Sequence, residues 1–96
     1  MNEQGIQKKI LTYLDSIGAY SFKVLSANKN GVHDIVGCYK GKFFSVEVKT
    51  PVTQKNVSPL QAYNLRKVIA SGGYSIIAWD VSQVKQMIGD MDEVLI

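Results

Sequence analysis

The stretch HDIVGCYKGKFFSVEVK, residues 33–49, decides the fold because it predicts two strands joined by a short turn. Residues 33–39 and 42–50 are rich in aromatic and β-branched side chains, which are typical of strands. Lys40 and Gly41 between them form a two-residue loop, a length that joins antiparallel neighbours. The sequence therefore predicts a β-hairpin in the middle of the chain.

The register of this hairpin decides which side chains face each other. A two-residue loop pairs Tyr39 with Lys42 and, further along both strands, Asp34 with Glu47. A four-residue loop keeps the two acids opposed. A loop of three or five residues would shift the register and place them on opposite faces of the sheet.

Opposed carboxylates are unfavourable without a partner. Their Cβ atoms lie about 5 Å apart, and two such charges repel by about 3–4 kcal/mol at an effective dielectric constant near 20. A divalent cation between them reverses the sign of the interaction, and Mg²⁺ prefers one or two protein carboxylates together with water and phosphate oxygens. Asp34 and Glu47 therefore form a candidate metal site.

Lys49 follows Glu47 by two residues and should share its face of the strand. An ammonium there can act on the attacking water or on the phosphate during phosphodiester hydrolysis. Phe44, Val46 and Val48 alternate with these polar residues, which predicts a core on the other face. The alternative interpretation is a surface ion pair between Glu47 and Lys49 on a half-exposed strand.

Before the hairpin, the sequence predicts one helix and one strand. Apolar side chains recur at helical spacing over residues 3–17, and Gly18 is suited to end the helix. Residues 19–26 are rich in aromatic and branched side chains and predict a strand. Asn30 and Gly31 then indicate a turn in the loop that leads to the hairpin.

After the hairpin, a second helix should run from Ser58 to about Ser71, with apolar side chains facing inward at Leu65, Val68 and Ile69. The apolar run over residues 74–80 predicts a strand that is buried on both faces, with Trp79 in the core. A short helix over residues 82–88 and a tail over residues 91–96 complete the chain.

The element order αβββαβα predicts one α/β domain over residues 1–96, with a mixed sheet flanked by helices. The formal charge of +3 favours an acidic partner such as nucleic acid, although only weakly. No apolar run is long enough to span a membrane. The single cysteine, Cys38, is expected to be a small buried thiol and fits a reducing cytoplasm.

The string Gly31-Val32-His33-Asp34, a gap of twelve residues and then Glu47-Val48-Lys49 resemble the PD-(D/E)XK nuclease signature. With a helix first and another beginning at Ser58-Pro59-Leu60-Gln61, nearly the whole chain is similar to a stand-alone, phage-like VRR-NUC domain of that superfamily. The resemblance implies a restriction-endonuclease-like core.

The resemblance also implies roles for individual residues. Asp34 and Glu47 match the metal-binding acids, and the backbone carbonyl of Val48 matches a further ligand. Lys49 matches the catalytic lysine, which orients or deprotonates the attacking water. The implied cofactor is Mg²⁺, with Mn²⁺ as a substitute, and neither a membrane nor a small-molecule cofactor is expected.

Two residues outside the hairpin complete the implied site. Gln61 matches a catalytic polar residue at the start of the following helix, although a capping box with Ser58 also explains it. Glu3 matches an acid on the first helix that can hold the metal through water, although the helix dipole favours an acid there in any case.

DNA contacts are expected from residues around the site. The family often has proline before the first acid, whereas this chain has His33, which either touches a phosphate or fills the loop. Lys23, beside the hairpin, and Lys29 and Lys55, in loops, are candidate phosphate contacts. Further basic residues on loops and helix faces are Lys40, Lys42, Arg66 and Lys67.

The resemblance implies a metal-dependent DNA endonuclease that acts as a homodimer on branched DNA such as Holliday junctions. It also implies a cytoplasmic protein of viral origin in a bacterial host. One alternative is a catalytically inactive nucleic-acid-binding module of the same fold, against which the complete acid–acid–lysine set argues. Another is a protein-interaction domain, which the basic charge slightly disfavours.

Overall fold

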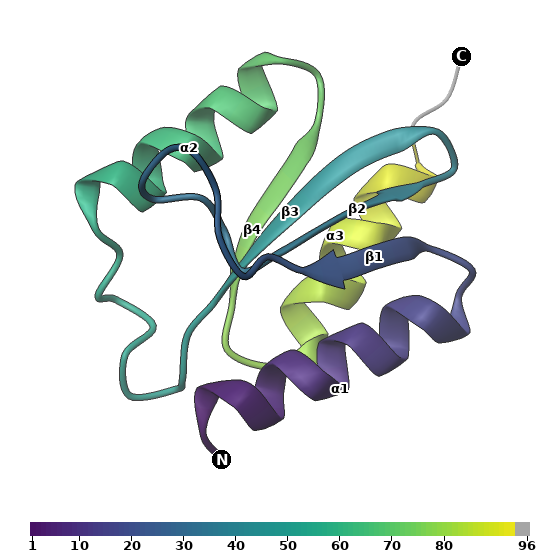
Figure 1. The fold of residues 1–96 in the computed structure, drawn as a ribbon. Helices are drawn as coiled ribbons and strands as arrows, with labels where there is room; N and C mark the ends of the chain where they lie inside the picture. Colours follow the sequence, from purple (N-terminus) through teal and green to yellow (C-terminus); the bar gives the residue numbers. More distant parts are fainter. Residues whose placement is uncertain (94–96) are drawn as a thin grey trace.

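The helices and strands follow one another in the predicted order, αβββαβα, in the computed structural model, which describes residues 1–93 (Figure 1). They are α1 (Glu3–Ser16), β1 (Tyr20–Lys23), β2 (Ile35–Tyr39), β3 (Lys42–Val48), α2 (Pro59–Ala70), β4 (Tyr74–Ala78) and α3 (Val81–Asp92). The strands lie in the order β1-β2-β3-β4; the first three are antiparallel, and β4 runs parallel to β3. The predicted mixed sheet is confirmed.

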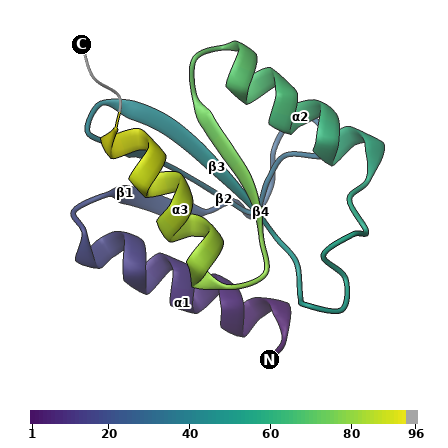
Figure 2. The same cartoon turned by 180° about the vertical axis from the view of Figure 1, so that it is seen from behind.

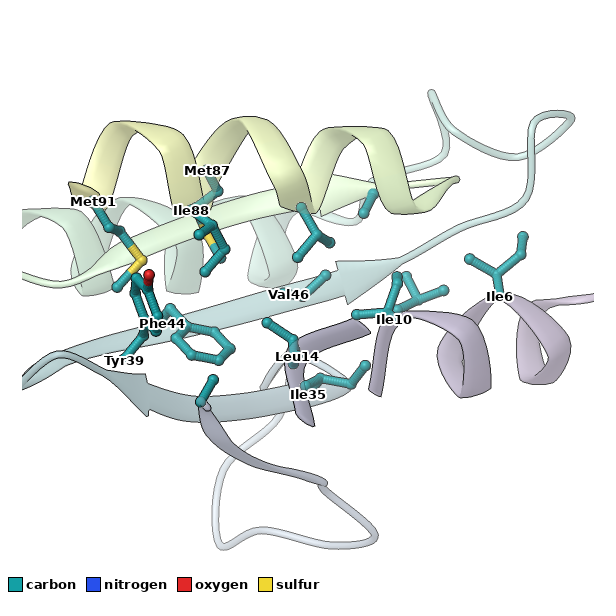
Figure 3. Packing of buried hydrophobic residues seen from close by; sticks show 14 residues of the cluster. Ile6, Ile10, Leu14, Ile35, Tyr39, Phe44, Val46, Met87, Ile88 and Met91 are labelled. Carbon is teal, nitrogen blue, oxygen red and sulfur yellow. The ribbon is translucent and has the colours of Figure 1, made fainter. Parts of the chain in front are cut away.

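The helices cover the two faces of the sheet unequally. Helices α1 and α3 contact each other on one face, as Figure 2 shows, and close the hydrophobic core. Phe44 and Val46 of β3 point into this core (Figure 3). Both are fully buried, as is Val48, which confirms the prediction. Helix α2 contacts β3 and β4 on the opposite face, so the β1–β2 part of that face has no helix over it.

Helix α3 is longer than predicted. Asp80 caps its first turn by accepting a hydrogen bond from the backbone N–H of Ser82. Its buried side chains continue at helical spacing to Met91, which therefore lies in the helix and not in a tail. Of the predicted tail, residues 94–96 lie outside the described residues. No helix within residues 1–93 is long and apolar enough to cross a membrane.

Four predictions of burial were wrong, and the sheet order and the orientation of α2 explain them. Strand β4 is an edge strand, so it is only partly buried, and Trp79 after it is partly exposed instead of lying in the core. Cys38 is exposed because it lies on the uncovered β1–β2 part of the sheet. Ile69 also points outward, because the buried face of α2 is centred on Asn64.

Candidate active site

The hairpin has the predicted register, with Tyr39 opposite Lys42. Lys40 and Gly41 form the turn, with φ angles of 49° and 79°. Two consecutive left-handed residues are typical of the tight turn that matches the twist of antiparallel strands. This turn therefore fixes the pairing along the whole hairpin.

The same register brings the two acids together. Ile35 is the first residue of β2 and pairs with Val46. Asp34 immediately precedes Ile35, and Glu47 immediately follows Val46, so the acids meet at the open end of the hairpin. Both belong to the face opposite the core, since side chains alternate along a strand.

Asp34 is held by backbone hydrogen bonds on two sides. Its Oδ2 accepts a hydrogen bond of 2.8 Å from the N–H of Val48, and its carbonyl accepts one of 2.7 Å from the N–H of Val24. In an antiparallel strand the N–H and C=O of one residue point to the same neighbour. The Val48 carbonyl is therefore also directed towards the Asp34 side.

Glu47 is a buried carboxylate with one oxygen left over. The residue is 3% exposed. Its Oε2 accepts a hydrogen bond of 3.1 Å from Gln61 Nε2 and lies 3.8 Å from Lys49 Nζ. Its Oε1 is buried and has no hydrogen-bond partner among residues 1–93. Buried oxygens rarely remain unpaired, so Oε1 is a candidate ligand atom, and a carboxylate pair beside a backbone carbonyl could hold a hard divalent cation.

The electrostatics of Glu47 agree with this placement. The pKa of the Glu47 carboxyl is raised to about 8, mainly because the group is buried. The charge of Asp34 also contributes to the raised pKa, whereas the charge of Lys49 lowers it. Without a bound cation the Glu47 carboxyl therefore carries a proton at neutral pH.

Gln61 reaches the site from the first turn of α2. It forms a capping box with Ser58, in which Gln61 Oε1 accepts from the N–H of Ser58 and the N–H of Gln61 donates to Ser58 Oγ. The amide nitrogen of the same side chain donates to Glu47. Gln61 thus caps the helix and binds the carboxylate at once.

Glu3 lies near the site without joining the carboxylate pair. Its charge contributes to the raised pKa of Glu47. However, no three His, Cys, Asp or Glu side chains gather around one point in the described part of the chain. One turn after Glu3, the buried Gln7 has an unpartnered Oε1. Sequence reasoning missed Gln7, although a polar residue next to an apolar helical stripe was the available signal.

Of the two alternatives for His33, the structure supports the one in which the residue fills the loop before Asp34. The residue is 2% exposed, and both ring nitrogens are bonded inside the protein. Nδ1 lies 2.9 Å from Ser45 Oγ, and Nε2 lies 2.9 Å from the carbonyl oxygen of Gln61. No ring nitrogen is left for a phosphate. Ser45 and Ser75, which complete this network, were not singled out in the sequence.

The candidate DNA-binding lysines are exposed at different places. Lys23 lies at the end of β1 nearest the site, but it pairs with Ile35 and so belongs to the core face by register. Lys29 borders a pocket of about 390 Å³ between α2 and the sheet, whose wall also includes His33. Lys55 lies in the loop between β3 and α2. Phosphate contacts of these lysines stay predictions.

Lys40 and Lys42 lie at the opposite end of the hairpin from the two acids. Lys40 forms an ion pair of 3.0 Å with Asp92, and Lys42 donates a hydrogen bond to the carbonyl of Met91. Both side chains therefore bond the hairpin turn to α3 and do not face the site.

The described elements follow the order αβββαβα around a mixed sheet, and two acids and a lysine lie at the end of its central hairpin. A solved structure described as a VRR_NUC domain superposes with a TM-score of 0.74, covering 91% of this chain and 94% of that one at 21% sequence identity. The chain therefore has the fold of a VRR_NUC domain, as the sequence resemblance implied. No family model and no curated protein matches the sequence.

Proposed function

We propose that this protein is a metal-dependent endonuclease that hydrolyses phosphodiester bonds in DNA. The observation that carries the proposal is the buried Glu47 carboxylate, whose Oε1 has no partner although a second carboxylate, Asp34, lies beside it. A sheet gains nothing from such a pair alone, because both desolvation and repulsion oppose it. The nuclease-like fold supports the same conclusion.

Each group at the site has a separate role in the proposed reaction. Asp34, Glu47 and the Val48 carbonyl would hold Mg²⁺, or Mn²⁺ in its place, with Glu3 acting through water. The bound cation supplies positive charge that polarises the phosphate and activates water. Lys49, whose side chain is 12% exposed, keeps its ammonium beside Glu47 and would orient the attacking water.

Gln61 contributes through Glu47. Its amide donates to Oε2 and so directs the unpartnered Oε1 away from α2. A carboxylate whose second oxygen is already bonded has fewer orientations available, so less order must be gained when a ligand binds. Gln61 therefore pre-organises the proposed metal ligand.

The proposed substrate is DNA, and branched DNA in particular. The net charge of +3 favours a polyanion. Lys23 is exposed at the end of β1 nearest the site, and Lys29 and Lys55 are exposed in loops. Lysine contacts to phosphates position a duplex without reading its sequence. We therefore propose recognition of DNA shape.

The proposed assembly is a homodimer, because one site cuts one strand and a junction offers two equivalent strands. Tyr20 and Phe22 are 73% and 49% exposed on the part of the sheet that no described helix covers, and Phe43, 49% exposed, lies on the same face of β3 next to α2. Exposed aromatic side chains on one surface are typical of an interface. The proposed partner is a second copy of this chain. Comparing the sedimentation of the wild type with that of Phe43→Ser measures how strongly the chain self-associates.

Cleavage of labelled junction, flap and linear DNA in Mg²⁺ tests the proposed activity. We expect wild-type protein to cut branched DNA, and Asp34→Ala and Lys49→Ala to lose cleavage. Asp15→Ala and Lys8→Ala are matched controls, since they remove the same charges from exposed positions on α1. Binding without cleavage by the wild type would indicate the inactive DNA-binding module instead.

A further inference from the structure

His33 sits at the centre of a closed hydrogen-bond network between the sheet and α2. Ser45 Oγ of β3 lies 2.9 Å from its Nδ1, and Ser75 Oγ of β4 lies 3.2 Å from the same atom. The two hydroxyl oxygens are 2.7 Å apart. On the other side of the ring, Nε2 lies 2.9 Å from the Gln61 carbonyl oxygen.

The chemistry of the partners determines which ring nitrogen carries the proton. A carbonyl oxygen can only accept, so Nε2 must hold the hydrogen and donate it to Gln61. In the neutral ring Nδ1 is then the acceptor, and the nearer hydroxyl, that of Ser45, donates to it. Ser75 can in turn donate to Ser45, which gives every member of the network a partner.

This network reaches the proposed metal site from two directions. His33 immediately precedes Asp34 in the chain. Through Nε2 it also holds the backbone of Gln61, whose side-chain amide donates to Glu47. One imidazole ring therefore connects the residue beside one acid to the residue that binds the other.

We propose that His33 is a positioning residue of this site, whose neutral, Nε2-protonated ring holds the first turn of α2 against the sheet and keeps Gln61 on Glu47. The inference rests on the proposed nuclease function for its kinetic consequence. Its structural part, control of Gln61 by His33, does not depend on that function. Outer partners of a metal ligand of this kind are worth about 10- to 100-fold in activity or metal affinity.

Two amide substitutions separate the two halves of the network. In His33→Gln the side-chain N–H can take the place of Nε2–H and keep the bond to Gln61, whereas in His33→Asn the shorter amide reaches only towards the serines. We expect kcat within about threefold of wild type for His33→Gln and a loss of about 10- to 100-fold for His33→Asn. The KM for DNA stays unchanged in both, because the ring is buried and does not touch the substrate.

Melting temperatures serve as the control for stability. The proposal would be overturned by equal losses of kcat in the two variants or by a raised KM in either. It would also be overturned if the loss of kcat in each variant were proportional to its loss of melting temperature. A role in packing alone predicts one of these results, because packing does not distinguish which ring nitrogen is replaced.

Nitrogen NMR of the histidine ring and of the Gln61 side-chain amide provides a readout without DNA. We expect a neutral ring protonated at Nε2 in the wild type, and a shifted Gln61 amide signal in His33→Asn but not in His33→Gln. A proton on Nδ1, or an unchanged Gln61 signal in both variants, would refute the positioning role. If wild-type protein cuts no DNA, the proposed function fails, and these signals still decide the role of His33.

Discussion

The two faces of β3 differ in whether their buried groups have suitable partners. On one face Phe44, Val46 and Val48 are fully buried in the hydrophobic core against α1 and α3. On the other face Glu47 is nearly as buried, yet one carboxylate oxygen has no partner. Equal burial therefore has opposite consequences on the two faces: it stabilises the first and destabilises the second.

The difference indicates where this small domain gives up stability for the proposed metal site. Apolar burial is favourable in proportion to the area removed from water. Burial of a carboxylate beside another carboxylate is unfavourable, and the pKa of about 8 for Glu47 records that cost. Substitutions on the two faces should therefore separate stability from activity.

The largest effect is expected from neighbouring phenylalanines that point to opposite faces. Phe44→Ala should lower the free energy of unfolding by about 3–5 kcal/mol, since it leaves a cavity in a closed core. Phe43→Ala, at a side chain that is 49% exposed, should cost about 1 kcal/mol or less. Urea unfolding measures both. Similar losses in the two variants would mean that the faces do not differ as described.

Glu47→Gln should move stability and activity in opposite directions. At pH 8 and above we expect it to raise the free energy of unfolding of the metal-free protein by about 1–3 kcal/mol, because an amide carries no buried charge. Cleavage of DNA should be lost. The pKa of Glu47 is raised on folding, so the wild type loses stability as the pH rises from about 4.5 to about 8.

The pH dependence supplies the control for this substitution. Below about pH 4.5 the Glu47 carboxyl is protonated in both the folded and unfolded states, so the gain of Glu47→Gln should disappear there. Unfolding curves of both proteins at pH 4 and pH 8 test this. A gain that is the same at both values would show that the buried charge is not its cause.

Binding of Mn²⁺ should depend on the same proton. A cation competes with the proton on Glu47, so the apparent affinity should rise about tenfold per pH unit up to the pKa of about 8 and then level off. Calorimetry in buffers of different ionisation heat should show about one proton released per ion below that pH. Chelation of the metal should abolish cleavage, and an affinity that is flat between pH 6 and pH 8 would contradict the site.

How much of this could be predicted from the sequence depends on the range of the interactions. The register of Asp34 and Glu47 was predictable because the two-residue turn at Lys40 and Gly41 fixes it locally. Exposure of Trp79 and Cys38 was not, because it depends on which strand ends at the sheet edge and which part of a face α2 covers.

The role of His33 was beyond sequence reasoning for the same reason. Its partners Ser45, Gln61 and Ser75 are 12, 28 and 42 residues away in the chain. No short motif joins them, and only the packing of α2 on β3 and β4 brings them to one ring. The family-like pattern, in contrast, could place Gln61 near the site because it occupies a fixed position in the helix N-terminus.

The smallest expected effect compares two helix caps. Ser58→Ala and Asp80→Ala each remove an N-cap side chain, from α2 and α3 respectively, and should each cost about 1 kcal/mol of stability. Only Ser58 also binds Gln61. Although both variants should lower the melting temperature by a similar amount, only Ser58→Ala should lower kcat, by about 3- to 10-fold. Matched melting curves and cleavage rates measure this. Equal kcat for the two variants would mean that the cap of α2 stabilises the helix without positioning Gln61 on Glu47.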